Sequence, residues 1–333
     1  MVFIMSNCWI IEKKDKQRNL RLVSLPSLHP GRGELKIEVH YAGINRADLL
    51  QWEGVYPQPG PPVAHEIPGL EFSGFISEVG LEVEHWKEGD PVFGLVVGGA
   101  FSTEIIVQQR MLLAVEGSLS LMEAAAIPET FFTAWDGLEY RLKAKENETI
   151  LISAAGSGVG LSALALAKIK NLRPFCTVRT PSKKEKLLKL GALDVLVEEE
   201  QDLGDWSLSR TGGKGMDLIF DLVGGKKFSL YPCIVAEKGR ILCLGLLGGT
   251  KTEISLDLLL RKRLTIVGST LRSRPIEEKM ILTQDFRKKI LPYFTRGELK
   301  PIIERVFSWE ELPQALEYLK ANKNFGKLLL KVS

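Results

Sequence analysis

Cysteine and histidine are scarce in this chain of 333 residues, with four of each. They are Cys8, Cys176, Cys233 and Cys243, and His29, His40, His65 and His85. The cysteines stand too far apart for a metal-binding spacing, and two of them fall inside apolar runs, which predicts buried, reduced thiols in a reducing compartment. The histidines have no ligand-like neighbours, so we expect surface or packing roles for them.

Long apolar runs and a strong excess of one charge are also missing. The net charge is +3, with 45% hydrophobic and 26% charged residues, typical of a globular protein of about two domains. This charge is too small to indicate nucleic-acid binding, and no run reaches the roughly 18 apolar residues of a membrane span. The N-terminal M-V-F-I-M-S-N-C-W-I-I has no basic segment before it, so we expect a first strand rather than a signal peptide, and a cytoplasmic protein.

The strict dinucleotide-binding pattern G-x-G-x-x-G is incomplete, although its surroundings are present. Residues 149–160 read T-I-L-I-S-A-A-G-S-G-V-G, with Ala155 and Ser157 in place of two glycines. Alone, this segment also fits a tight turn that needs a positive φ. A helix over 160–172, a strand over 174–178 and a second helix to Leu190 would complete a βαβ unit, which favours a phosphate-binding turn at the helix N-terminus.

An acidic residue is missing at the end of the second strand of this unit. NAD-binding chains usually place an acid there to hold the ribose 2′-hydroxyl. Here Arg179 occupies the position, followed by Thr180 and Lys183. Because arginine suits bidentate phosphate binding, this substitution predicts a site for the 2′-phosphate of NADPH.

The pattern of elements changes near residue 125. Before it, short apolar runs at 35–39, 74–79, 90–97 and 101–107 indicate an antiparallel β-rich module. After it, strands over 149–153, 174–178, 195–197, 216–221, 239–244 and 264–269 alternate with helices, as in a doubly wound parallel sheet. The tail predicts helices at 276–291 and 309–322 and a closing strand that returns to the first module. We therefore expect domains at 1–125 and 126–270, and a C-terminal segment at 271–333.

Nine ordered motifs run through most of the chain. They are G-I-N-R-A-D-L (43–49), G-V-Y-P-Q-P-G (54–60), P-G-L-E-F-S-G (68–74), W-K-E-G-D (86–90), A-A-A-I-P-E-x-x-x-T-A-W (124–135), S-A-A-G-S-G-V-G (153–160), D-L-V-G-G (221–225), L-R-S-R (271–274) and A-N-K-N-F-G-K (321–327). In these motifs the chain resembles the zinc-free quinone oxidoreductases of the medium-chain dehydrogenase/reductase superfamily. The similarity to the tumour-suppressor-inducible quinone oxidoreductase branch rests chiefly on the last two motifs.

This resemblance implies an α/β fold: a Rossmann doubly wound parallel sheet plus a GroES-like antiparallel β-barrel domain. It also implies chemistry without zinc, because the zinc enzymes place cysteine and histidine where this chain has Asn45 and Leu70, leaving only Glu71. A catalytic zinc needs three protein ligands. By the same resemblance we expect a homodimer joined at strand 264–269.

Two residues are the candidates to donate a hydrogen bond to the acceptor oxygen during hydride transfer. The resemblance implies that Tyr56, in the proline-rich loop 54–68, faces the substrate, and Asn45 carries an amide that can donate. The alternatives are that Tyr56 only packs and that Asn45 caps a helix. The expected cofactor-binding residues are Ser157, Gly158, Val159, Arg179, Thr180, Lys183, Leu244, Gly245, Ser269, Thr270, Leu271 and Asn324.

The expected reaction is the NADPH-dependent reduction of a quinone or a related electron-poor carbonyl. An enone or enoyl reductase would use the same fold, and a crystallin-like protein that binds NADPH or RNA is a non-enzymatic alternative. Acids at Glu198–Glu200, where related reductases often have a tyrosine, would weaken the preference for NADPH.

Overall fold

The computed structural model describes residues 5–14, 17–56, 58–61 and 63–333. It divides into two units: unit 1 holds Met1–Phe132 and Leu271–Ser333, and unit 2 holds Thr133–Thr270. The first boundary lies seven residues beyond the expected 125. The reason is aromatic packing within unit 1, where Phe131 contacts Phe294 and Phe132 contacts Phe286, with ring centroids 4.9 Å and 4.6 Å apart.

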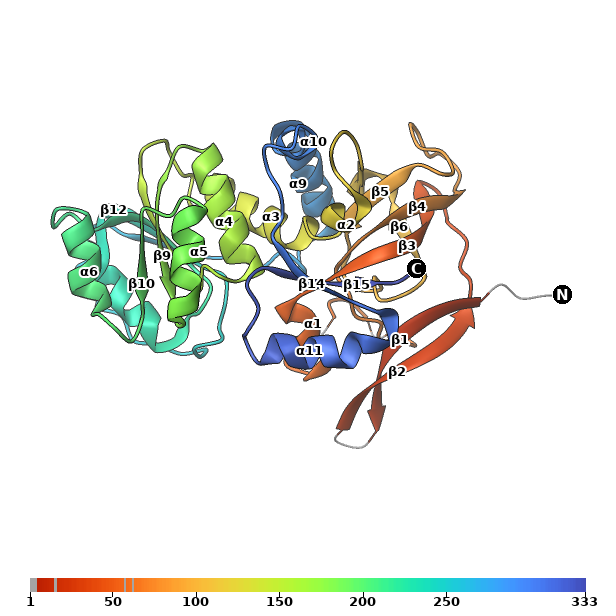
Figure 1. Cartoon of the computed structure of the whole chain (residues 1–333), viewed down its shortest axis with the longest axis horizontal. Helices are drawn as coiled ribbons and strands as arrows, with labels where there is room; N and C mark the ends of the chain where they lie inside the picture. The colour runs from red at the N-terminus through yellow and green to blue at the C-terminus, as the bar shows by residue number, and fades with distance from the viewer. Residues whose placement is uncertain (1–4, 15–16, 57, 62) are drawn as a thin grey trace. The chain divides into compact units, whose positions relative to one another are not determined.

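Unit 2 contains a parallel sheet of six strands in the order β10-β9-β8-β11-β12-β13 (Figure 1). Counted along the chain, this is the 3-2-1-4-5-6 order of the Rossmann fold, so the predicted doubly wound sheet is confirmed. β12 begins at Val235, before the predicted start at residue 239. The prediction began late because Glu237 and Lys238 interrupt the apolar run of this strand. The strands are β8 (Thr149–Ile152), β9 (Arg173–Val178), β10 (Asp194–Val197), β11 (Met216–Asp221), β12 (Val235–Cys243) and β13 (Thr265–Gly268).

Helices connect these strands and cover their apolar side chains. The alanine-rich α4 lies against β8 and β9 (Figure 1). Strand side chains such as Leu151 and Ile219 are fully buried, as expected where a parallel sheet is covered on both faces. The helical segments are η2 (Asp136–Arg141), α4 (Gly158–Ile169), η3 (Pro181–Lys183), α5 (Lys184–Lys189), α6 (Leu203–Arg210), η4 (Gly225–Leu230), α7 (Tyr231–Ile234) and α8 (Leu256–Arg261).

Unit 1 contains a largely antiparallel sheet of seven strands. Its order is β14-β15-β3-β4-β5-β7, and β6 pairs with β3. The four strands predicted in this module are present, with shifted ends. The strands are β3 (Glu34–Ile44), β4 (Glu71–Val79), β5 (Pro91–Leu95), β6 (Glu104–Gln108), β7 (Leu112–Ala114), β14 (Ile303–Phe307) and β15 (Lys327–Lys331).

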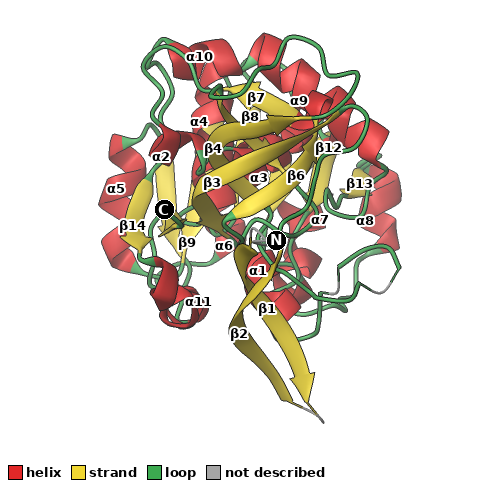
Figure 2. Cartoon of the chain, turned by 90° about the vertical axis from the view of Figure 1, so that its right-hand side faces the viewer, coloured by secondary structure: helices red, strands yellow, loops and turns green. Residues whose placement is uncertain are grey.

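An N-terminal hairpin forms a separate two-stranded sheet of β1 and β2 (Figure 2). β1 (Met5–Lys14) confirms the predicted first strand from Met5 onward, while residues 1–4 lie outside the described residues. The indole N–H of Trp9 donates to the carbonyl of Trp309, which fixes the hairpin within unit 1. The sequence did not predict β2 (Gln17–Pro26), because most of its residues are polar or exposed.

Short helices surround the sheet of unit 1. The predicted helix at 276–291 is present and ends at Lys289, before a separate short helix. The predicted helix at 309–322 is a single 3-10 turn followed by an α-helix. The helical segments are α1 (Arg46–Trp52), η1 (Gln109–Met111), α2 (Leu121–Ala124), α3 (Pro128–Trp135, which crosses into unit 2), α9 (Ile276–Lys289), α10 (Leu291–Thr295), η5 (Trp309–Glu311) and α11 (Leu312–Lys320).

The end of the chain joins the first module. β15 pairs antiparallel with β3, and Leu329 lies opposite Gly43 (Figure 1). The side chains of Leu328, Leu329 and Leu330 are almost completely buried. This pairing brings Lys327 to the end of β3, where Ile44 and Asn45 begin the turn into α1.

Candidate active site

Asn45 is the N-cap residue of α1, as the alternative interpretation expected. Its backbone N–H donates to Asp48 Oδ2 at 2.7 Å, so the acid in the first turn closes the helix start. Asp48 Oδ1 accepts a second backbone N–H, from Gly69 at 3.0 Å. Asp48 is completely buried, and burial raises the pKa of its carboxyl to about 7.

The Asn45 side chain belongs to a buried polar cluster. Its amide donates to Glu71 Oε1 at 2.8 Å, and its carbonyl oxygen accepts from Lys327 Nζ at 2.7 Å. Lys327 Nζ also donates to Glu71 Oε1 and forms an ion pair with it. A Cβ on Gly43 would lie 2.1 Å from this same oxygen, so the cluster requires glycine there. Asn45 therefore holds the Glu71–Lys327 pair, and whether it also contacts a substrate stays a prediction.

The other oxygen of Glu71 is engaged as well. Glu71 Oε2 accepts the backbone N–H of Glu129 at 2.8 Å, in the first turn of α3. Glu71, the residue left from the zinc-ligand trio, is thus fully bonded to an ammonium group, an amide and a backbone N–H. Groups of three or more histidine, cysteine or acidic side chains that could hold a metal are absent from the part of the chain that the structure describes.

Tyr56, in the loop that follows α1, is half-buried, and its phenol interacts electrostatically with Glu129 and Arg272. The guanidinium of Arg272 stacks over its ring at 5.4 Å and donates to its backbone carbonyl at 3.4 Å. Arg272 also donates to Val97 O and Gln51 Oε1, so it fixes the Tyr56 backbone to two other segments. Burial raises the pKa of the phenol, and the Glu129 carboxylate raises it further. Between residues 5 and 333, leaving out the undescribed positions, no side chain or backbone group hydrogen-bonds the phenol. Pro57 and Pro62 of this loop lie outside the described residues.

The predicted phosphate turn of unit 2 follows β8. Ser157 is the N-cap of α4, and its hydroxyl accepts the N–H of Gly160 at 3.1 Å. Gly158 and Val159 form the first turn, where helical N–H groups have no partner within the helix. A Cβ on Gly160 would lie 2.7 Å from Ala155 Cα, so glycine allows the helix to approach the turn after β8 closely. The turn thus has the construction of an anion site at a helix N-terminus.

A second group of bonds fixes the carboxyl ends of β8 and β11, where the strand order reverses. The hydroxyls of Ser153 and Tyr231 both donate to Asp221 Oδ1, at 2.9 Å and 2.7 Å. Asp221 also accepts the N–H groups of Val223 and Gly224, so it holds the D-L-V-G-G turn. Doubly wound sheets bind their ligands at this point of reversal.

The residues predicted to bind the 2′-phosphate follow β9. Arg179 and Thr180 are exposed, and Lys183 is half-buried. Arg179 makes no hydrogen bond or ion pair with another described residue. Glu198, the first of the three acids that counted against NADPH, forms an ion pair with Lys227 and accepts from the Thr177 hydroxyl. Its charge is therefore already balanced within unit 2.

The other cofactor candidates lie at strand ends. In unit 2, Leu244 N donates to Asp221 O, and a Cβ on Gly245 would lie 2.2 Å from Leu222 O. The Ser269 hydroxyl donates to Asp136 Oδ2 at 3.1 Å, and the exposed Thr270 ends the unit.

In unit 1, Leu271 is buried. Asn324 is buried as well, and its amide donates to Gly326 O. That bond supports the turn before β15, so contact of Asn324 with a cofactor stays a prediction.

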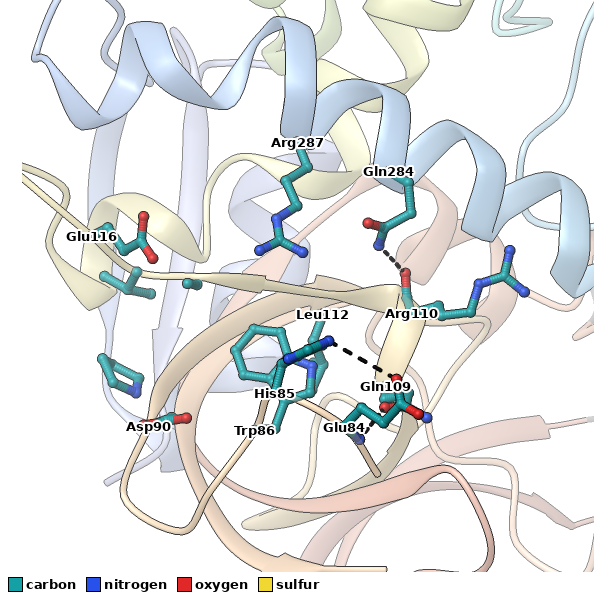
Figure 3. Close-up of a pocket in the computed structure, with 13 residues that line it drawn as sticks. Glu84, His85, Trp86, Asp90, Gln109, Arg110, Leu112, Glu116, Gln284 and Arg287 are labelled. Atoms are coloured by element: carbon teal, nitrogen blue, oxygen red, sulfur yellow. Dashed lines mark hydrogen bonds and ion pairs between the residues drawn. The ribbon is translucent and has the colours of Figure 1, made fainter. Parts of the chain in front are cut away.

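A hollow elsewhere on unit 1 contains none of the predicted residues. Arg287 and Gln284 project into it from α9, opposite Trp86 and Leu112 (Figure 3). Gln284 donates to the carbonyl of Arg110 at its rim. The hollow has acidic and basic side chains and a highly exposed His85, so its charge favours no single class of ligand.

Comparison with known proteins matches both units. Residues 31–117 match the alcohol dehydrogenase GroES-like domain, and residues 158–287 match the family described as zinc-binding dehydrogenase. Quinone oxidoreductase-like protein 2 of Bos taurus is 31% identical, covering 89% of this chain and 84% of that protein. Quinone oxidoreductase of Rattus norvegicus is 27% identical, covering 90% of each. Among solved structures, the CurK enoyl reductase superimposes with a TM-score of 0.88 at 26% identity, covering 98% of this chain and 99% of the other.

These matches define an oxidoreductase with a GroES-like domain and a Rossmann domain, and they imply a nicotinamide cofactor. The chain belongs to the quinone oxidoreductase-like family of the medium-chain dehydrogenase/reductase superfamily, as the motifs predicted. A separate finding is that no helix among the described residues is long and apolar enough to cross a membrane.

Several residues of the site were not singled out from the sequence. Lys327, Arg272 and Glu129 complete the cluster of unit 1, and Asp221 fixes the turn of unit 2. All four belong to matched motifs: A-N-K-N-F-G-K, L-R-S-R, A-A-A-I-P-E and D-L-V-G-G. The motifs could therefore have pointed to these residues from the sequence. They could not show that Lys327, Arg272 and Glu129 come together in the folded chain.

Proposed function

We propose that this protein is an NADPH-dependent quinone oxidoreductase that works without zinc. The observation that carries the proposal is the Tyr56 phenol. It is half-buried, held by Arg272 and left without a hydrogen-bond partner among the described residues, beside a cluster whose Asn45, Glu71 and Lys327 are bonded to one another. A phenol so placed can donate to an acceptor oxygen as negative charge develops there.

The construction of unit 2 fits a dinucleotide. Gly160 permits close approach of α4 to the turn after β8, and the first turn of that helix offers backbone N–H groups to a pyrophosphate. In the proposal Ser157, Gly158 and Val159 hold the pyrophosphate, and Leu244, Gly245, Ser269, Thr270, Leu271 and Asn324 line the nicotinamide end. When bound, the cofactor supplies the hydride.

The preference for NADPH rests on Arg179, Thr180 and Lys183. Arg179 is exposed and has no hydrogen-bond or ion-pair partner among the described residues, so a 2′-phosphate can use both of its guanidinium edges. Glu198 forms an ion pair with Lys227, so its negative charge repels a 2′-phosphate less than an unpaired acid would. This supports a 2′-phosphate site.

Chemistry without zinc is supported by the bonds of Glu71. Its two oxygens accept from Lys327, Asn45 and the N–H of Glu129, so a metal ion would have to displace an ammonium group. Quinones are electrophilic enough to accept hydride with the help of hydrogen bonds alone. They can therefore be reduced at a site that has hydrogen-bond donors and no metal ion.

A second candidate is the reduction of an enone or enoyl compound, favoured by the similarity to CurK enoyl reductase. Because these acceptors are less electrophilic, they depend more on the Tyr56 hydrogen bond. A crystallin-like role that binds NADPH or RNA is the non-enzymatic alternative.

The test combines binding and turnover. Fluorescence titration with NADPH and NADH measures the two affinities, and a panel of quinones and enones then measures kcat/KM with the preferred cofactor. We expect tighter binding of NADPH and faster turnover of quinones. Faster turnover of enones would favour the second candidate, and binding with no turnover of any acceptor would favour the non-enzymatic one.

We also propose a cytoplasmic homodimer. β13 is the last strand in the order of its sheet, and Leu256 and Leu260 of the adjacent α8 are 65% and 75% exposed. An edge strand with apolar neighbours favours pairing with a second copy. The free, buried thiols of Cys8 and Cys176 agree with a reducing compartment.

A further inference from the structure

Asp221, the last residue of β11, is completely buried in unit 2, and hydrogen-bond donors surround its carboxylate. Its Oδ1 accepts from the hydroxyls of Ser153 and Tyr231 at 2.9 Å and 2.7 Å. Backbone N–H groups complete the set, from Val223 to Oδ1 at 3.1 Å and from Gly224 to Oδ2 at 2.7 Å. Burial and the charge of Asp221 raise the pKa of the Tyr231 phenol, which therefore stays protonated and donates. Because every one of these neighbours donates, they stabilise the ionised carboxylate.

The charge of Asp221 is not paired with a cation among the described residues. Its donors are uncharged hydroxyl and backbone groups. Glu198, a second acid that acts on Tyr231, already forms an ion pair with Lys227. The positive end of α4 also lies at the carboxyl edge of this sheet, but in the proposed function a pyrophosphate occupies it. Unit 2 therefore keeps a buried negative charge that no side chain it describes neutralises.

Asp221 lies in one row with the ends of the next two strands. The strand register pairs Asp221 with Cys243 of β12, and Cys243 with Gly268 of β13. Leu244 and Ser269, which directly follow these strand ends, are expected at the nicotinamide end of the cofactor. Leu244 N donates to Asp221 O at 2.9 Å. Because neighbouring strands lie about 4.8 Å apart, Leu244 and Ser269 are one and two strands away from Asp221. The carboxylate acts along this row, since its charge adds to burial in raising the pKa of the Cys243 thiol.

We propose that the Asp221 carboxylate favours the oxidised cofactor over the reduced one and thereby makes bound NADPH a stronger hydride donor. This inference rests on the proposed function. When the C4–H bond of the cofactor breaks, the hydride goes to the acceptor and the neutral nicotinamide ring becomes positively charged. A buried carboxylate without a cation stabilises the positive ring and not the neutral one, because charges in a poorly solvated site are weakly screened. Asp221 assists hydride transfer through this difference.

The test compares two affinities in the absence of any acceptor. Titration calorimetry gives the Kd of NADP⁺ and of NADPH for wild type and for Asp221→Asn, which keeps the shape of the side chain and removes its charge. The ratio of the Kd for NADP⁺ to the Kd for NADPH should rise about tenfold in the variant. For a two-electron couple this equals a rise of about 30 mV in the potential of the bound cofactor. A purely structural role of Asp221 would weaken both forms alike and leave the ratio unchanged.

The same strand offers a matched control. Asp217 lies near the opposite end of β11, where it accepts from the backbone and the hydroxyl of Thr149. Asp217→Asn removes one charge from the same strand and should keep the wild-type ratio. Tyr231→Phe removes a hydrogen bond and keeps the charge of Asp221, so it should weaken both forms by the same factor. Asp221→Ser is a second neutral variant and should raise the ratio even if Asp221→Asn does not fold.

The outcomes separate this proposal from the proposed function. If the neutral variants bind both forms with the wild-type ratio, the proposal is overturned and the proposed function stands. An equal rise in Asp217→Asn would also overturn it, because the effect would then come from the net charge of the protein. Wild-type protein that binds neither NADP⁺ nor NADPH would reject the proposed function and this inference with it.

Discussion

Lys327 Nζ and Glu71 Oε1 form a buried ion pair that joins the end of the chain to β4. The two side chains are 4% and 0% exposed, so neither charge is solvated by bulk water. Glu71 is the one residue that remains of the zinc-ligand trio expected from the resemblance. Its charge and hydrogen bonds make it the fixed centre of the cluster.

The first prediction concerns this pair. Lys327→Met should lower the free energy of unfolding by about 3–5 kcal/mol, because Glu71 would keep a buried charge without its partner. Chemical denaturation measures the change. Lys331→Met, at the exposed end of the same strand, is the matched control and should lose much less.

A metal test follows from the same bonds. Activity should survive exhaustive chelation, and elemental analysis should find no stoichiometric zinc. About one tightly bound zinc ion per chain, whose removal abolishes activity, would reject chemistry without zinc.

The second prediction concerns cofactor choice. Arg179→Ala should weaken NADPH binding by about 1.5–3 kcal/mol, or roughly ten- to a hundredfold, because a charge-assisted bond to phosphate is lost. NADH binding should change little, and fluorescence titration measures both. Arg173→Ala, at the exposed start of β9, is the control. Equal losses for NADPH and NADH in Arg179→Ala would show that Arg179 does not contact the 2′-phosphate.

The third prediction assigns a role to one oxygen atom. Tyr56→Phe keeps the ring that stacks on Arg272, so stability and NADPH affinity should hardly change. Loss of the donor should lower kcat/KM by about a hundredfold for enones and less for quinones, because quinones need less activation. Steady-state kinetics with both classes of acceptor measure the effect. An unchanged kcat/KM for every acceptor would mean that Tyr56 only packs.

The fourth prediction concerns the pH dependence of stability. The pKa of Glu129 rises from 4.5 to about 8 on folding, and that of Asp48 rises from 3.8 to about 7. Between the unfolded and folded values the native state binds more protons, so the free energy of unfolding should fall as the pH rises through this range. Each proton contributes a slope of up to about 1.4 kcal/mol per pH unit.

Denaturation of wild type and Glu129→Gln across this range provides the measurement. The variant should show a shallower slope above the folded pKa of Asp48, since the Glu129 contribution is removed. Identical slopes for the two proteins would mean that Glu129 is ionised at neutral pH.

The fifth prediction concerns assembly. Light scattering at micromolar concentration should report a dimer of the 37.1 kDa chain. Leu260→Glu should favour the monomer, because it places a charge on an exposed apolar position of α8, the helix that precedes the edge strand in the chain. Ile281→Glu, at an exposed position of unit 1, is the control. A wild-type protein that is monomeric at this concentration would reject the proposed dimer.

Local patterns predicted most elements of the fold. Apolar runs with glycine turns gave β8 and α4, because a buried parallel strand and a phosphate turn leave strong marks on composition. β2 was missed because polar residues make up much of it and the alternation of its apolar residues breaks between Leu22 and Val23. The unit boundary was placed seven residues early because aromatic contacts of Phe131 and Phe132 decide it, and those contacts join distant segments.

The sequence by itself determined the family, the two kinds of sheet and the motifs that contain the site residues. Only the tertiary structure showed that Asn45 is bonded to Glu71 and Lys327, and that no residue it describes hydrogen-bonds the Tyr56 phenol. The physical reason is that the sequence shows which side chains are polar, whereas strand pairing and burial determine which of them form hydrogen bonds with one another. The pairing of β15 with β3 brings Lys327 to Glu71 from 256 residues away, and no spacing rule in the sequence encodes that contact.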